Sequence, residues 1–275
     1  MSIASKLTVG FLAAACISTV SAAEKVILKI EKPEDFIQAK SVTASDDDAM
    51  AFKGTYTNLF SKQMIKVDPA RKYRISGDFC LKGGKPVSLF FGFVPYDKNK
   101  VQILPNAVSG SNKTLTTVAE DAKKGDKVIK VKDASKWNVK SPYSYIVFNA
   151  AEDYSDMPNR NSVHTVAPNA RQTGEVWEIT LKTPLKADIA AGTAVRQHFD
   201  AGTYIYAAGS FKTLGVWKTR TGTISGIAAS GAPSNKFWKG TETVRVLILA
   251  LNGDKQSETE FKNIKVEEVK DVKQK

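Results

Sequence analysis

The segment 71–96 constrains the fold more than any other part of the chain, because its side chains alternate in the manner of β-strands. In its first half, apolar residues recur at every second position or a multiple of it: Tyr73, Ile75, Phe79 and Leu81. This period predicts a half-buried strand. The second half, up to Tyr96, is apolar on both faces, as expected of a strand near the middle of a sheet. Gly83 and Gly84 predict a tight turn between the two strands.

Short strand patterns continue along the chain, and evidence for helices is thin throughout. Further strands are expected at 26–30, 49–53, 62–67, 101–104, 128–131, 145–148, 162–166, 175–181, 193–198, 204–206, 213–217, 222–227, 243–251 and 261–269. From about residue 111 to 198 the strands are short, and a loop rich in Asp, Asn and Pro follows residue 148 and runs to Asn161. The patterns predict an all-β protein, a jelly-roll-type antiparallel β-sandwich of residues 24–110 plus 199–269. A smaller β domain, 111–198, is expected as an insert, with a tail at 270–275.

The N-terminus has the features of a secretory signal peptide, expected to span 1–23. Lys6 supplies a positive charge, residues 7–20 form an apolar run, and small residues at 20–23 offer cleavage sites. The run is too short to span a bilayer, so we expect a secreted, periplasmic or cell-envelope protein without a transmembrane segment. Cys16 lies in a stretch that faintly resembles a lipoprotein box, but the usual large aliphatic residue is absent.

Removal of the signal peptide would leave Cys80 as the one cysteine of the mature chain, so no intramolecular disulfide is expected. Export without disulfides suits a bacterial envelope or exterior. The formal net charge is +12, or +11 after Lys6 is lost. Such a charge attracts polyanions, including acidic polysaccharides. The lysines are scattered rather than gathered in an arginine-rich helix, so we expect no nucleic-acid partner.

Four stretches together resemble the exported carbohydrate-binding modules of the galactose-binding-like class, especially the family 4/9 type. They are Lys72–Gly84, Val87–Asp97, Phe237–Leu251 and Phe261–Val269, and with the segments around them the resemblance covers about half of the chain. It implies a jelly-roll sandwich that binds glycans, sometimes with a structural calcium. The chain departs from that family in having no attached catalytic domain and in carrying Asn263 near positions where the family often has acidic residues.

Glycan recognition needs flat apolar rings for sugar faces and polar side chains for hydroxyl groups. The candidate rings are Trp217 and Trp238, which lie beside lysines near expected loops, and Tyr96 at the end of the central strand. Arg74 and Asp78, on the polar face of the central strand, are candidate hydrogen-bonding groups. Each tryptophan also suits the alternative of a core residue.

Few residues in the chain suggest catalysis or a bound cofactor. The two histidines, His164 and His198, lie far apart in the sequence, and no zinc, phosphate-binding or nucleophile motif occurs. The acidic loop Asp46–Asp48 lacks the spacing of a known calcium loop. We therefore expect no cofactor, with a structural calcium unsupported by any motif.

Two functions remain open at this level. The first is an exported, non-catalytic glycan-binding protein that recognises polysaccharide through the candidate residues Trp238, Trp217, Tyr96, Arg74 and Asp78. The second is a structural or assembly protein of the cell envelope or extracellular matrix. An enzyme that degrades polysaccharide has the least support, because paired carboxylates such as Glu267 and Glu268 are adjacent and face opposite sides of a strand.

Overall fold

The computed structural model describes residues 25–269, and the chain is all-β, as its sequence predicts. These residues form strands β1 to β17 and four three-residue 3-10 helices, η1 (Pro33–Asp35), η2 (Ala39–Ser41), η3 (Pro105–Ala107) and η4 (Asn112–Thr114). No helix in this range is long and apolar enough to cross a membrane. The expected signal peptide (1–23), with Cys16, and the expected tail (270–275) lie outside the described residues.

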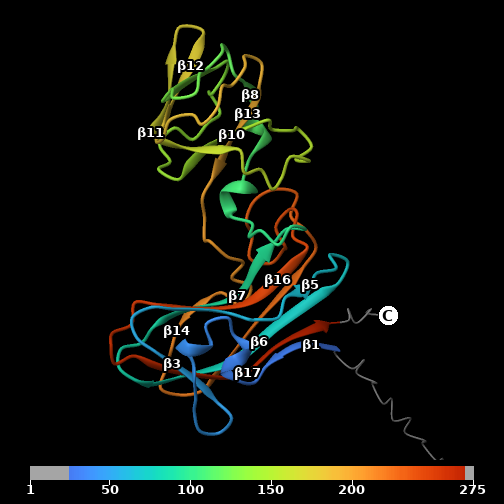
Figure 1. Cartoon of the computed structure of the whole chain (residues 1–275), viewed down its shortest axis with the longest axis vertical. Helices are drawn as coiled ribbons and strands as arrows, with labels where there is room; N and C mark the ends of the chain where they lie inside the picture. Colours follow the sequence, from blue (N-terminus) through green and yellow to red (C-terminus); the bar gives the residue numbers. More distant parts are fainter. Residues whose placement is uncertain (1–24, 270–275) are drawn as a thin grey trace, which may run out of the picture.

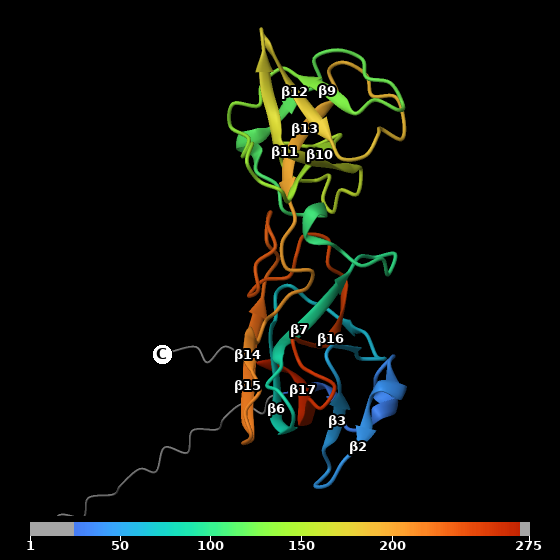
Figure 2. The same ribbon diagram turned by 90° about the vertical axis from the view of Figure 1, so that its left-hand side faces the viewer.

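Two antiparallel sheets form the lower part of the molecule in Figures 1 and 2. Sheet I has the order β15 (Lys218–Ser225), β6 (Lys72–Gly83), β17 (Glu258–Val269), β3 (Met50–Lys53) and β2 (Thr43–Ala44), with β1 (Lys25–Ile30) also paired to β17. Sheet II has the order β14 (Ser210–Lys212), β7 (Ser88–Tyr96), β16 (Thr243–Leu251) and β4 (Thr57–Phe60), with β5 (Ile65–Lys66) also paired to β16. Both sheets bring together strands from opposite ends of the sequence.

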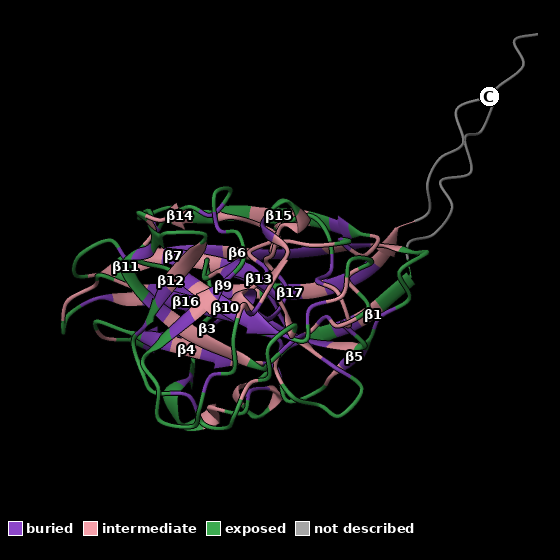
Figure 3. Cartoon of the chain, turned by 90° about the horizontal axis from the view of Figure 1, so that it is seen from above, coloured by how far each residue is buried: buried purple, intermediate pink, exposed green. Residues whose placement is uncertain are grey.

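The inner faces of Sheets I and II share one hydrophobic core. Phe79 of β6 packs edge-on against Phe91 of β7, with ring centroids 5.2 Å apart, and also stacks on Phe261 of β17. All three side chains are at most 2% exposed. Figure 3, which looks along the molecule, shows that buried residues concentrate on the inner strands and exposed residues on the surrounding loops. This packing makes the two sheets a β-sandwich.

The expected hairpin between the two strands of segment 71–96 is wrong. β6 pairs with β15 and β17, and β7 pairs with β14 and β16, so the chain crosses from Sheet I to Sheet II after Gly83. Both strands have an apolar face, and these two faces are buried because β6 and β7 lie opposite each other across the core. Gly84 permits the crossing because its φ is +72° and a Cβ there would lie 2.3 Å from the backbone of Gln256.

Sheet III forms the upper part of the molecule in Figure 1. Its order is β8 (Thr116–Thr117), β13 (Ala194–Phe199), β10 (Ser144–Phe148), β11 (Ser162–Thr173), β12 (Val176–Leu181) and β9 (Val128–Val131). Ile179 of the sheet and Trp137 of the connection between β9 and β10 belong to a buried cluster separate from the sandwich core. The sheet occupies the sequence range in which we expect an inserted domain, and independent folding of 111–198 stays a prediction.

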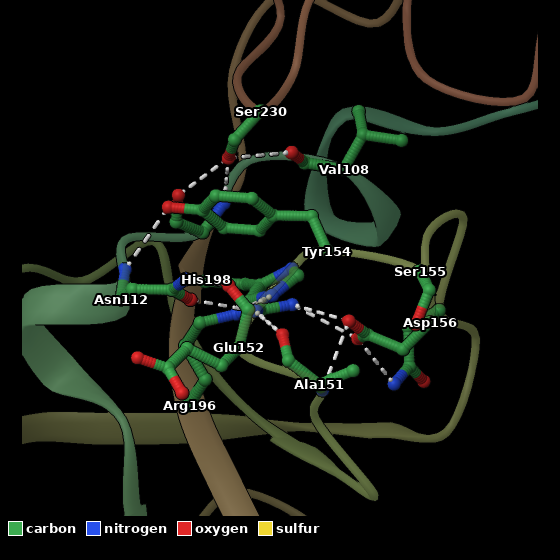
Figure 4. A network of polar contacts seen from close by, with 12 residues as sticks. Val108, Asn112, Ala151, Glu152, Tyr154, Ser155, Asp156, Arg196, His198 and Ser230 are labelled. Atoms are coloured by element: carbon green, nitrogen blue, oxygen red, sulfur yellow. Dashed lines mark hydrogen bonds and ion pairs between the residues drawn. The ribbon is translucent and has the colours of Figure 1, made fainter.

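A buried polar network centred on Arg196 ties Sheet III to the sandwich (Figure 4). The Arg196 guanidinium is 0% exposed and forms an ion pair with Asp156 at 2.9 Å. It also donates hydrogen bonds to the carbonyl of Ala151 and to His198 Nε2, at 2.9 and 3.0 Å. Burying this charge is tolerable because each side of the guanidinium meets an acceptor.

His198 connects this network to the segment that leaves the sandwich. Its Nδ1 donates to the carbonyl of Asn106 at 2.8 Å, because a carbonyl can only accept, and its Nε2 accepts from Arg196. The ring is therefore neutral. Burial lowers the pKa of His198 to about 4, with the nearby Arg196 charge acting in the same direction and the bond to Asn106 opposing it.

The network makes stability depend on pH in a defined direction. Between pH 6.5 and 4 the unfolded chain protonates His198 and the folded chain does not, so the free energy of unfolding falls as pH falls. We expect His198 to account for a loss of about 2 kcal/mol between pH 7 and pH 5. The His198→Asn variant, measured by urea denaturation at both pH values, should lack that part of the loss. Equal losses in both proteins would contradict the assignment.

Candidate functional site

The outer face of Sheet I carries polar side chains along the neighbouring strands β15, β6 and β17, and we call it the polar face. On β6, Ile75 and Phe79 point into the core, so Ser76 and Asp78 lie on the opposite, outer side. The register places Asp78 beside Thr219 of β15 and Lys262 of β17. The alternation that builds the core therefore also builds a row of polar groups outside it.

Asp78 is the centre of the hydrogen bonding on the polar face. Its Oδ1 accepts a bond from the Thr219 hydroxyl at 2.6 Å, and its Oδ2 accepts one from the Asn263 amide at 2.7 Å. The three side chains come from three neighbouring strands. Asp78 thus orients a hydroxyl and an amide that can exchange hydrogen bonds with a ligand.

A β-bulge in β17 brings Asn263 into this position. The pairing between β17 and β6 shifts between Lys262 and Lys265, and Asn263 has a φ of +55°. Asparagine adopts this left-handed conformation more readily than most residues with a side chain. The bulge turns the Asn263 amide towards Asp78, where a regular strand would direct it to the core side.

A pocket of about 680 Å³ opens beside these groups. Its polar and charged lining consists of Ser76, Asp78, Thr219, Asn263, Lys29, Lys265, Glu31 and Asp48. Ser76 is 9% exposed, and its hydroxyl has no hydrogen-bond partner within residues 25–269. A pocket lined by hydroxyl, amide and carboxylate groups can hydrogen-bond a ligand rich in hydroxyl groups.

Trp217 lies at the edge of the polar face, immediately before β15. Its side chain is 37% exposed, and the Lys262 ammonium lies 4.7 Å from its ring centroid. This cation–π contact holds the ring against the sheet. The expected strand at 213–217 is wrong: the residues between β14 and Lys218 form a connection, and β15 starts at Lys218. Trp217 therefore retains exposed ring surface next to Thr219.

Arg74 lies further along the same face, where it is tied to a buried acid. Glu267 is 4% exposed and accepts from Arg74 at 2.9 Å and from Lys265 at 2.8 Å. Burial alone would raise the pKa of Glu267, but hydrogen bonds from Lys265 and Arg74 outweigh it and lower the pKa below its usual value. Arg74 thus orders the polar face and does not line the pocket.

Tyr96 lies on the outer face of Sheet II, on the other side of the sandwich. It belongs to a partly buried group of rings there, and the guanidinium of Arg245 is 5.8 Å from its ring centroid. Burial raises the pKa of the Tyr96 hydroxyl. Tyr96 and Trp217 therefore belong to separate surfaces and cannot contact the same sugar ring.

Trp238 is a core residue, which corrects its sequence-based assignment as a sugar-stacking ring. Its side chain is 0% exposed, it belongs to the core cluster of the sandwich, and its Nε1 donates to the carbonyl of Pro233 at 3.0 Å. A ring without an open face cannot stack on a sugar. The structure thus brings together Trp217, Asp78 and Arg74 on one face and removes Trp238 and Tyr96 from it.

The pocket and its surroundings contain four residues that are not among the candidates expected from the sequence: Ser76, Thr219, Asn263 and Lys262. One signal was present: in β17 the apolar residues Phe261, Ile264 and Val266 are spaced by three and then two. A strand with a constant period of two has no such step, so it indicates a bulge. The sequence pattern does not predict which residues contact Asp78, because local periodicity does not determine the order of strands in a sheet.

No group of three or more His, Cys, Asp or Glu side chains suited to holding a metal ion occurs among residues 25–269. Asp48 of the acidic loop is one of the lining residues of the pocket, and both Asp47 and Asp48 have positive φ values. The chemistry that the described side chains offer at this site is hydrogen bonding, charge and aromatic contact.

Comparison with known proteins leaves the family open. No protein-family model matches the sequence, and no curated protein matches it. A solved structure described as "CBM4 structure and function" is similar over 89% of this chain and 94% of that chain, with 10% sequence identity and a TM-score of 0.32. The strand pairing of the chain itself therefore defines its class, an all-β protein with a β-sandwich.

The core position of Trp238 predicts a large effect on stability. Trp238→Ala should lower the free energy of unfolding by about 3–5 kcal/mol, because it leaves a cavity in the sandwich. Trp217→Ala, at an exposed ring, should change it by about 0.5 kcal/mol. Guanidinium denaturation of both variants would check this, and similar values for the two would contradict the assignment.

The bulge predicts that residue 263 is sensitive to the backbone it must adopt. Asn263→Ala should lower the free energy of unfolding by about 1–2 kcal/mol, since alanine strains at positive φ and loses the bond to Asp78. Asn263→Gly loses the same bond without the strain and should cost less. Thermal unfolding of the pair would separate these effects, and an equal cost would argue against strain.

Proposed function

We propose that this chain is an exported, non-catalytic protein that binds polysaccharide on the polar face of Sheet I. The observation that carries the proposal is the placement of an exposed Trp217 ring beside a pocket of hydrogen-bonding groups anchored by Asp78. Sugar rings present both apolar C–H faces and hydroxyl groups, so they match such a combination. The Lys6 and 7–20 signal pattern supports export.

The hydrogen bonds among the side chains of the pocket favour a binding role. Both carboxylate oxygens of Asp78 already accept hydrogen bonds from side chains, which positions Asp78 as an organising group. His198 is buried in the network that joins Sheet III to the sandwich, away from this pocket. The galactose-binding-like resemblance of the strands supports the same function as a hypothesis.

Assembly is the second candidate function, and one observation favours it. Leu214, Val216 and Trp217 are 46%, 56% and 37% exposed within one short connection at the edge of Sheet I. Three neighbouring apolar side chains in solvent form a patch that a second copy of the chain can cover. In that case the Trp217 ring would contact protein.

The decisive experiment is binding of the signal-free protein to neutral, acidic and sulfated polysaccharides at low and high salt. We expect Trp217→Ala to weaken salt-resistant retention at least about tenfold, because stacking on a sugar ring does not depend on charge. Tyr143→Ala, which removes a ring 64% exposed in the turn before β10 of Sheet III, is the matched control and should bind normally.

Three results would count against glycan binding on this face. Retention by the wild type that disappears with salt would indicate charge attraction alone. Equal binding by Trp217→Ala and wild type would remove Trp217 from the site. Absence of retention, with light scattering that shows concentration-dependent assembly abolished by Trp217→Ala, would favour the assembly function.

A further inference from the structure

A second groove lies between β3 of Sheet I and β4 of Sheet II, apart from the pocket on the polar face. Its volume is about 580 Å³, and its lining includes Lys40, Ser41, Thr43, Lys53, Tyr56 and Asn58. The two pockets share no lining residue. The groove is therefore a separate candidate for a ligand.

Tyr56 gives this groove an aromatic surface. It lies in the connection between β3 and β4, and its side chain is 60% exposed. An exposed ring of this size contributes little to the core, and in a groove it offers a flat face to a ligand. Ser41 and Thr43 add hydroxyl groups to the same lining.

The charge of the groove differs from that of the Sheet I pocket. Its lining contains two lysines, Lys40 and Lys53, and no acidic residue. Lys53 is 3.2 Å from Glu258, whereas no carboxylate lies within 4 Å of the Lys40 ammonium in the described part of the chain. The Sheet I pocket combines two lysines with three carboxylates. The groove is thus the better site for an anion.

Asn58 of the groove lining contacts further aromatic side chains, which favours an extended ligand. The Asn58 amide donates to the Tyr204 hydroxyl at 3.3 Å. Tyr204 packs against Phe60 and Tyr206, with ring centroids 5.9 and 6.2 Å away, and these side chains are partly buried on the outer face of Sheet II. A chain-like ligand seated on Tyr56 can therefore extend across Asn58 towards Tyr204.

We propose that this groove is a second binding site, which takes an acidic polysaccharide containing uronic acid residues. Tyr56 contacts a sugar ring, the hydroxyl groups of Ser41 and Thr43 contact sugar hydroxyls, and Lys40 pairs with a carboxylate. A nucleic acid fits less well, because it needs many phosphate contacts and the groove lining contains two lysines. The site does not depend on Trp217, so it stands apart from the function proposed for the polar face.

The test uses the full signal-free protein and alginate, a polyuronate, with laminarin as a neutral glucan and single-stranded poly(dT) as a nucleic acid. We expect Tyr56→Ala to weaken alginate affinity about tenfold and Lys40→Gln about threefold. Tyr143→Ala and Lys136→Gln are the matched controls, since both residues are exposed on the part of the chain that carries Sheet III. The two control variants and Trp217→Ala should still bind alginate through the groove, so the Tyr56→Ala change should weaken their alginate affinity as much as it weakens that of the wild type.

The outcomes separate this site from the polar face. If Tyr56→Ala and Lys40→Gln weaken alginate binding and the control variants do not, the result supports the groove site. This holds whether or not Trp217→Ala changes the affinity for laminarin. Equal weakening by Lys40→Gln and Lys136→Gln, with none by Tyr56→Ala, would reduce the effect to net charge and overturn the proposal. Wild-type protein that fails to bind alginate, or that binds poly(dT) more tightly through Tyr56, would overturn it as well.

Discussion

The burial of the inner faces of Sheets I and II against each other is the interaction on which the rest of the structure depends. Phe79, Phe91 and Phe261 meet at its centre, from three strands and both sheets. Because side chains alternate along a strand, directing Phe79 inward directs Asp78 outward. The same packing that stabilises the sandwich therefore creates the polar face, and a change of register in β6 would lose both.

The connection to Sheet III rests on a different kind of interaction. Arg196 is fully buried, and its guanidinium is neutralised by Asp156 and hydrogen-bonded to His198 and Ala151. A polar network in a water-poor interior is directional, since each donor needs an acceptor at a set place. His198, bonded to Asn106, thereby gives Sheet III a defined attachment to the segment that leaves the sandwich.

The two candidate binding regions differ in chemistry because they arise from different parts of the sandwich. The Sheet I pocket sits over paired strands, where outward residues of neighbouring strands bond one another and charges of both signs balance. The groove at Tyr56 lies where the sheet edges and their connections meet, and its lysines have no acidic neighbour in the lining. The two regions therefore offer a ligand different charges, mixed over Sheet I and positive at the groove.

Local periodicity in the sequence was sufficient to predict an all-β sandwich and the outward direction of Asp78 and Arg74, because side-chain alternation belongs to each strand separately. It was insufficient for the pairing of strands, so the expected hairpin in 71–96 was wrong, with β6 and β7 in different sheets. It also did not decide that Trp238 is buried and Trp217 exposed, since a tryptophan near a loop suits either place. Only the tertiary structure joins Asp78 to Thr219 and Asn263, because contacts between residues distant in sequence depend on strand order, register and a bulge.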